Sequence, residues 1–164
     1  MEPLDLRCQL LDLLAVLEVK YAKKKVSVEL EGPDEMLVEF DRSSLSICLE
    51  RIIDNALKFS DDSGHVTIKY SVTNLSDDEW VTVRVRDRGC GIDPERLDYL
   101  YKALSLGCSA YDHTRGGGLS LAIVREIAWR HNGTIRLESA GEGHGCEATL
   151  GFPRRSTPER YYID

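Results

Sequence analysis

Apolar and polar residues follow two different periods along this chain, and the longer period predicts helices. Leu6, Leu10, Leu14 and Leu17 recur at helical spacing near the start of the sequence. Three further segments carry a similar stripe or a helix-start signal. The predicted helices are about the first twenty residues, a segment from an N-cap at Asp41 or Ser43 to about Phe59, a segment that starts at Asp93-Pro94-Glu95, and Gly118 to His131.

A period of two residues predicts strands between these helices. Val66 to Val72 and Trp80 to Val85 alternate on either side of the loop from Thr73 to Glu79, so we expect an antiparallel pair. The other predicted strands are Val26 to Leu30, Leu37 to Phe40 after a turn at Gly32-Pro33-Asp34, Thr134 to Leu137, and Glu147 to Phe152. Helices and a partly antiparallel sheet together predict an α/β fold.

Length and charge narrow the class of protein. The 164 residues suffice for one core, and we expect one domain over residues 1–153 with a polar tail over residues 154–164. The 28 acidic and 21 basic side chains give a formal charge of -7, which argues against binding to a nucleic acid backbone. The basic run Lys23 to Lys25 is expected to be a solvated helix end.

Cysteine usage and hydropathy indicate the cytoplasm and no membrane contact by this domain. The five cysteines form neither a disulfide framework nor a zinc pattern, and we interpret the nearby His144 and Cys146 as a coincidence. No apolar run reaches the length of about 20 residues that crosses a bilayer. The full-length protein can still be membrane-anchored through a segment outside this chain.

One face of the second predicted helix collects groups that suit a nucleotide. Arg51, Asn55, Lys58 and Phe59 lie together at i, i+4, i+7 and i+8, beside the apolar stripe of the same helix. An amide oxygen can bind Mg²⁺, and two cations can face phosphates. An ordinary exposed helix face explains the same pattern, so this helix alone does not decide between the two interpretations.

A carboxylate and two glycines follow the strand that ends at Val85. In Asp87-Arg88-Gly89-Cys90-Gly91-Ile92, alternate glycines allow close approach of backbone to a flat ligand or a positive φ. A carboxylate at a strand end can accept a hydrogen bond from an exocyclic amine such as that of adenine. The alternative is a surface aspartate beside a tight turn.

A glycine run precedes the last predicted helix. Arg115-Gly116-Gly117-Gly118 leads directly into Leu119 and the helix, where free backbone N–H groups and the positive dipole end can bind phosphate. A flexible linker is the alternative for any single glycine run. The helical asparagine, the aspartate with its glycines and the glycine-rich helix start come in this order within about 65 residues, which favours one nucleotide site.

These residues resemble the conserved boxes of sensor histidine kinases. Arg51 to Ser60 is similar to their N box, Asp87 to Ile92 to their G1 box, and Gly116 to Val124 to their G2 box. The resemblance extends over nearly the whole of residues 4–153. It implies the Bergerat fold of the gyrase, chaperone, kinase and MutL group: a two-layer sandwich of a mixed, largely antiparallel sheet with helices on one face.

The resemblance also implies roles in binding ATP and Mg²⁺. Asn55 would bind Mg²⁺, Asp87 would bind the adenine amine, and residues 105–117 would form a lid. The other implied site residues are Arg51 and Lys58 near the phosphates, Phe59 at the base, Gly89, Gly91 and Ile92 in the adenine pocket, and Arg115, Gly116, Gly117, Gly118 and Leu119 around the phosphates.

Three departures from the family pattern keep other functions open. Arg51 stands where these kinases usually carry Asn, Ser120 replaces a glycine of the G2 box, and Tyr101 to Leu104 replaces an aromatic-rich segment. A degenerate module that acts through protein contacts is therefore one alternative. An anti-sigma-type serine kinase is another, because it shares the ATP-binding boxes.

None of the four histidines has the sequence context of a phosphoacceptor in this family. The resemblance therefore implies that the acceptor histidine belongs to dimerisation helices of the full-length kinase. A response regulator would be a further partner of that full-length protein. The predicted activity is transfer of the γ-phosphoryl group of ATP to that histidine, as in two-component signalling.

Overall fold

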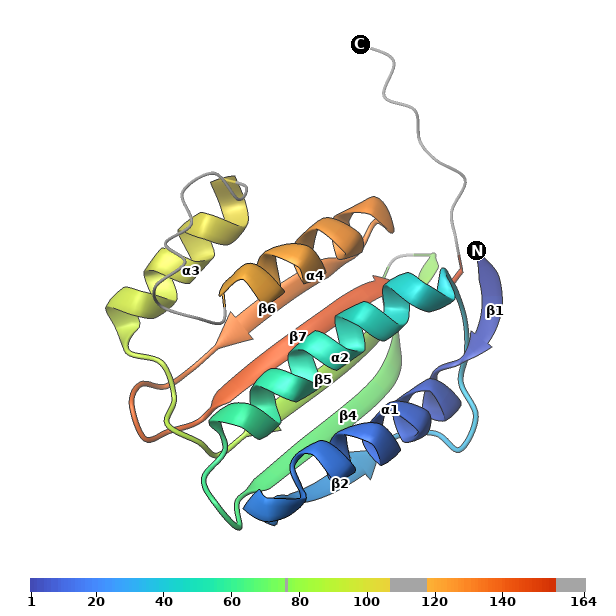
Figure 1. Cartoon of the computed structure of the whole chain (residues 1–164). Helices are drawn as coiled ribbons and strands as arrows, with labels where there is room; N and C mark the ends of the chain where they lie inside the picture. The colour runs from blue at the N-terminus through green and yellow to red at the C-terminus, as the bar shows by residue number, and fades with distance from the viewer. Residues whose placement is uncertain (76, 107–117, 156–164) are drawn as a thin grey trace.

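The computed structural model describes residues 1–75, 77–106 and 118–155, with the side chains of 101, 103–106 and 118–120 left undescribed. Its elements follow one another from a short N-terminal strand to a long C-terminal strand (Figure 1). They are β1 (Glu2–Asp5), α1 (Leu6–Lys20), the 3-10 helix η1 (Ala22–Lys24), β2 (Ser27–Glu31), β3 (Leu37–Phe40), α2 (Arg42–Phe59), β4 (His65–Leu75), β5 (Asp78–Asp87), α3 (Pro94–Leu106), α4 (Gly118–Arg130), β6 (Thr134–Glu138) and β7 (Cys146–Pro153).

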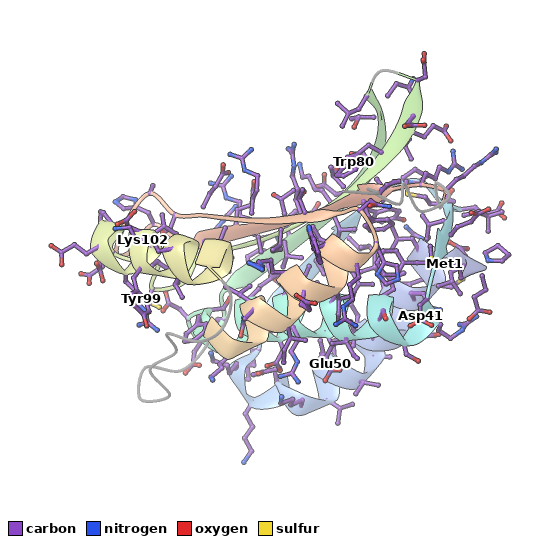
Figure 2. All side chains as sticks on the ribbon, turned by 90° about the horizontal axis from the view of Figure 1, so that it is seen from above. Met1, Asp41, Glu50, Trp80, Tyr99 and Lys102 are labelled. Atoms are coloured by element: carbon purple, nitrogen blue, oxygen red, sulfur yellow. The ribbon has the colours of Figure 1, made fainter. Side chains whose placement is uncertain are left out.

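The main sheet has five strands in the order β2-β4-β5-β7-β6. Within the described residues, β2 and β4 are the parallel pair of this sheet, with Ser27 beside His65, and its other neighbours are antiparallel. Helices α1, α2 and α4 cover one face of this sheet, while the opposite face carries no helix in the described part of the chain (Figures 1 and 2). The predicted two-layer α/β fold with a largely antiparallel sheet is therefore confirmed.

A separate two-stranded sheet is a feature that the sequence does not predict. β1 pairs with β3, which places Leu4 opposite Val38, and both side chains are buried. The first helix therefore begins only at Leu6, and the turn at Gly32-Pro33-Asp34 leads from the main sheet to the second sheet without closing a hairpin between β2 and β3. The four residues of β1 are too short a segment for a period of two to be recognised.

Helix α2 lies across the middle of the sheet and carries the first predicted site residues. Asp41 is its N-cap, because its carboxylate accepts a hydrogen bond from Ser44 N at 2.8 Å. Burial of each larger apolar side chain on its inner face contributes about 1.5–3 kcal/mol to stability. The buried residues are Leu45, Cys48, Leu49, Ile52, Ile53, Ala56 and Leu57.

The C-terminal end of α2 is held by a lysine from a distant turn. Lys24 Nζ donates hydrogen bonds to the carbonyl oxygens of Leu57 (3.1 Å), Lys58 (2.7 Å) and Ser60 (2.6 Å). A cation there meets the negative end of the helix dipole and satisfies carbonyls that lack helical partners. The interpretation of the whole basic run as a solvated helix end is wrong for Lys24, since its partners lie at the end of another helix.

Two further helices border the site. Asp93 caps α3 by accepting a hydrogen bond from Arg96 N at 3.0 Å, as its sequence predicts. The helix continues to Leu106, so the first residues of the segment predicted to form a lid are helical, and residues 107–117 lie outside the described residues. Helix α4 ends at Arg130, and Asn132 then takes a positive φ of 55°. Residues 156–164, most of the predicted tail, also lie outside the described part.

Candidate functional site

A cavity opens between α2, the end of β5, α3 and the start of α4. Its wall is mainly apolar with a few polar groups, which is typical of a small-molecule site. It is lined by Ile52, Asn55, Ala56, Phe59, Val85, Asp87, Cys90, Gly91, Ile92, Arg96, Leu100, Leu121, Leu137, Cys146 and Ala148. Segments distant in the sequence therefore meet around one hollow.

Asp87 supplies a buried carboxylate in this cavity. It is the last residue of β5, and its side chain is only 6% exposed. Its Oδ1 accepts a hydrogen bond from Gly89 N at 2.9 Å. Burial raises the pKa of Asp87, and the backbone amides of Gly89 and Cys146 lower it only in part. A carboxylate that accepts only these two backbone hydrogen bonds retains lone pairs that can accept another from a ligand amine.

The two glycines after Asp87 are needed because the loop is tightly enclosed. A Cβ on Gly89 would lie 2.0 Å from the carbonyl oxygen of Phe59, and Cys90 N donates to the same oxygen at 3.4 Å. Gly91 has a φ of 69°, and a Cβ there would lie 2.1 Å from Gly141 O. The loop is thus held between the end of α2 and the β6–β7 connection.

Ser139 ties these two loops together, although no motif in the sequence selects it. Its Oγ accepts hydrogen bonds from Ile92 N (3.0 Å) and Gly141 N (3.3 Å) and donates to Gly145 O (2.7 Å). One hydroxyl therefore fixes the backbone of both the loop after Asp87 and the β6–β7 connection. In the sequence, the signal that could have selected Ser139 is its position at the end of a predicted strand, just before a glycine-rich turn.

The predicted face of α2 reaches the cavity only in part. Asn55 and Phe59 line it, and Phe59 keeps 40% of its surface exposed. Lys58 is exposed, with its Nζ 5.4 Å from the centroid of the Phe59 ring, and it does not line the cavity. Arg51 is also exposed and does not line it.

The start of α4 faces the cavity. Helix α4 begins at Gly118, and Leu121 in its first turn is a lining residue. The free N–H groups of this helix end therefore lie near the cavity. Arg115, Gly116 and Gly117 lie outside the described residues, as do the surroundings of Gly118 and Leu119.

The structure adds wall residues that no motif indicates: Arg96 and Leu100 of α3, Leu121 of α4, Leu137 of β6, and Cys146 and Ala148 of β7. Burial raises the pKa of Cys146 to about 12, so its thiol stays protonated and lines the cavity as an apolar group. The apolar members of this set are recognisable in the sequence only as core residues.

Neither a metal cluster nor a membrane span occurs in the described residues. No group of three or more His, Cys, Asp or Glu side chains in this part of the chain could hold a metal ion. Mg²⁺ bound to a nucleotide needs only one or two protein oxygens, so the single amide of Asn55 fits that ion better than a metal held by protein alone. None of the described helices is long and apolar enough to span a membrane.

Comparison with known proteins connects this geometry to one family. The family described as "Histidine kinase-, DNA gyrase B-, and HSP90-like ATPase" matches residues 40–156. Sensor histidine kinase WalK of Bacillus subtilis is 33% identical over 129 residues, which are 77% of this chain and 21% of the relative. Histidine protein kinase DivJ of Caulobacter vibrioides is 36% identical over 129 residues, with the same coverage. The chain thus spans about a fifth of the length of these two relatives.

Solved structures agree in fold. The catalytic domain of histidine kinase ThkA, in a nucleotide-free form, superimposes with a TM-score of 0.77 at 22% identity. The match covers 95% of this chain and 98% of that one. The mycobacterial sensor histidine kinase MprB gives a TM-score of 0.73, also at 22% identity, over 95% of this chain and 99% of that one.

Proposed function

The chain belongs to the histidine kinase-, DNA gyrase B- and HSP90-like ATPase family, as a catalytic domain of the sensor histidine kinase type that binds ATP, and we propose that it phosphorylates a histidine on a separate dimerisation segment. A response regulator would then receive the phosphoryl group from the full-length protein. Since the chain matches only part of each relative, these partners belong to the proposal.

One observation carries the proposal: Asn55, Asp87 and Leu121, from three separated segments, line one cavity. Asp87 is the buried acceptor for the adenine amine, and Gly89, Gly91 and Ile92 form the loop against which the base lies. The exposed ring of Phe59 lines the side of the base. This arrangement supports a purine at the Asp87 end and phosphates toward the start of α4.

The phosphate end of the site needs cations and N–H donors. Asn55 would offer its side-chain oxygen to Mg²⁺, which when bound offsets charge on the phosphates. Lys58 and Arg51 are exposed on α2, Arg51 one helical turn before Asn55 and Lys58 about one turn after it, and each would place its cation near the phosphates. Arg115, Gly116, Gly117, Gly118 and Leu119 would complete the site with backbone N–H groups at the helix start.

The nucleophile has to come from elsewhere. Of the described histidines, His65 contacts Ser27 and Glu29, and the ring of His131 stacks on Phe40 with centroids 4.0 Å apart. Neither these two nor His144 lines the cavity, and His113 lies outside the described residues. A kinase domain of this kind mainly aligns the groups and offsets charge, so the acceptor can be a histidine of another segment.

Arg51 favours transfer over hydrolysis. A guanidinium stays protonated at any physiological pH, so it cannot act as the general base that activates water. Arg51 lies one helical turn before Asn55 and is exposed, where a cation can stabilise charge on the transferred group. We therefore expect slow ATP hydrolysis by the domain alone.

Calorimetry followed by a transfer assay tests the proposal. The domain is titrated with ATP with and without Mg²⁺, and is then incubated with labelled ATP and the separately purified dimerisation segment of its full-length protein. We expect Mg²⁺-dependent binding and acid-labile label on that segment. Absence of binding would indicate the degenerate module, and acid-stable label on a serine of a partner would indicate the anti-sigma-type kinase. Rapid ATP turnover without an acceptor would contradict the role given to Arg51.

A further inference from the structure

The face of the main sheet that lies opposite the helices forms a shallow polar groove. Figure 2 shows side chains standing along this face, above the sheet and away from α2 and α4. The groove is lined by Glu29, Glu31, His65, Thr67, Lys69, Arg84, Arg86, Arg88 and Glu147. Because side chains alternate along β5, the same strand directs Val85 and Asp87 into the nucleotide cavity and its arginines into this groove.

Three arginines run along the centre of the groove. Arg84, Arg86 and Arg88 are exposed, and within the described residues none of their side chains has an ion pair or hydrogen bond. Lys69 of the groove forms an ion pair with Glu31 at 2.9 Å, and the ring of His65 contacts Glu29 at 3.3 Å. The arginine row therefore retains its full capacity for bidentate hydrogen bonds.

The strand register places like charges together here. Lys69 is the direct neighbour of Arg84 across β4 and β5. Glu147 of β7 is the direct neighbour of Arg86 on the other side of β5, so the register gives Arg84 a cationic neighbour and Arg86 an anionic one. Like charges opposite one another in a sheet are unfavourable, and an anionic ligand over Arg84 would offset its repulsion from Lys69.

The spacing and the rims of the groove define the ligand. Alternate residues of a strand are about 6.6–6.8 Å apart, which is also the distance between alternate side chains of an extended peptide. Carboxylates at every second position of such a peptide would meet Arg84 and Arg86 of β5 in turn, and Arg88 follows directly after the end of the strand. Glu29 and Glu31 border the row on the β2 side and Glu147 on the β7 side, which disfavours a broad polyanion such as a nucleic acid.

We infer that this open face binds an extended segment of a partner protein that carries acidic side chains at alternate positions. The ligand would lie along β5 and bind through side chains, because β5 already uses its backbone groups in pairing with β4 and β7. Binding there needs no nucleotide. Peptide binding can therefore be tested independently of the proposed kinase function.

Fluorescence anisotropy with designed peptides tests this inference. The probe is a labelled nonapeptide with glutamate at alternate positions and threonine between them, and its control has the same composition with the glutamates contiguous. We expect the alternating peptide to bind at low salt and several-fold more tightly than the contiguous one, with weaker binding as salt screens the charges. The double variant Arg84→Glu, Arg86→Glu should weaken binding by at least about tenfold.

A matched double reversal separates site binding from general attraction. Lys23→Glu, Lys25→Glu changes the net charge by the same amount at two exposed positions outside the groove. It should weaken peptide binding much less than the groove variant does, because neither lysine lines the groove and a charge without direct contact to the peptide acts only through the screened field. Both variants should keep the original melting temperature within a few degrees and the original ATP affinity, which shows that they are folded.

Four results would overturn the inference. The first is no peptide binding at low salt, and the second is equal binding of the alternating and contiguous peptides. The third is equal loss in the two double variants. Tighter binding of a single-stranded oligonucleotide than of the alternating peptide would also overturn it, since the face would then be a nucleic acid surface. Each of these results leaves the ATP titration unchanged.

Discussion

Replacement of Asp87 by asparagine separates binding of adenine from stability of the fold. Asparagine has nearly the same shape and can keep an oxygen within reach of Gly89 N, 2.9 Å from Oδ1 in the structure. It replaces the second carboxylate oxygen with an N–H₂ donor and removes the charge. The adenine amine is itself a donor, so donor would meet donor where the complex needs an acceptor.

The expected loss of affinity follows from the type of bond removed. A hydrogen bond to a charged group contributes about 1.5–3 kcal/mol, which corresponds to a dissociation constant about 10 to 150 times larger. Stability should respond in the opposite direction. Because burial raises the pKa of Asp87 above its ordinary value of 3.8, ionisation costs the folded state stability as the pH rises from that value through the raised pKa. At pH 7 the neutral Asp87→Asn variant avoids this cost, so its free energy of unfolding should be equal or higher.

Calorimetry and thermal denaturation at pH 7 measure the two effects. Inosine triphosphate, which lacks the exocyclic amine, serves as a matched ligand control. The original protein should bind it more weakly than ATP by a similar factor, and Asp87→Asn should lose most of this discrimination. Unchanged ATP affinity in the variant would refute the adenine assignment. A parallel loss of affinity and stability would show that Asp87 is structural.

Substitutions at four further positions test other parts of the structure. Asn55→Ala should abolish most of the increase in ATP affinity that Mg²⁺ gives, with little effect on ADP binding without Mg²⁺, measured by calorimetry. Ser139→Ala should weaken ATP binding about fivefold to tenfold, because Ile92 N and Gly141 N lose a common acceptor, and Ser139→Thr should restore part of it. Gly89→Ala should cost about 1–3 kcal/mol in urea denaturation and weaken ATP binding, because its Cβ would meet Phe59 O at 2.0 Å. Lys24→Met should lower stability by about 1–2 kcal/mol while ATP affinity falls less than about threefold, since three carbonyls at the end of α2 lose their donor.

Each of these predictions has a result that contradicts it. Equal Mg²⁺ dependence in Asn55→Ala would remove the metal role. Equal affinities of Ser139→Ala, Ser139→Thr and the original protein would show that the hydroxyl does not position the loop. A Gly89→Ala variant of normal stability and affinity would mean that the loop can move away from α2. For Lys24→Met the matched control is Lys23→Met, at an exposed position, and equal loss in both would exclude the capping role.

Features that depend on neighbouring residues are determined by the sequence alone. The stripe of α2, the start of α3 at Asp93 and the antiparallel pairing of β4 with β5 follow from periodicity and local hydrogen bonding, and the structure confirms them. Of the two predicted caps of α2, the structure selects Asp41. The predicted loop from Thr73 to Glu79 is wrong, because β4 extends to Leu75 and β5 begins at Asp78. The glycines of the loop after Asp87 are also local, because backbone conformation restricts which residue fits. The resemblance to sensor histidine kinases depends on the same short motifs, and each motif lies within a few consecutive residues.

Contacts between distant segments are decided only by the tertiary structure. The cap of α2 by Lys24 and the link from Ser139 to Ile92 join residues 33 and 47 positions apart, and β1 pairs with β3 across the whole of α1. The walls at Leu100 and Leu121 and the groove around Arg84, Arg86 and Arg88 depend on how the helices and strands pack. Local preferences determine which elements form, but the partner of each side chain depends on which surfaces the folded chain brings together.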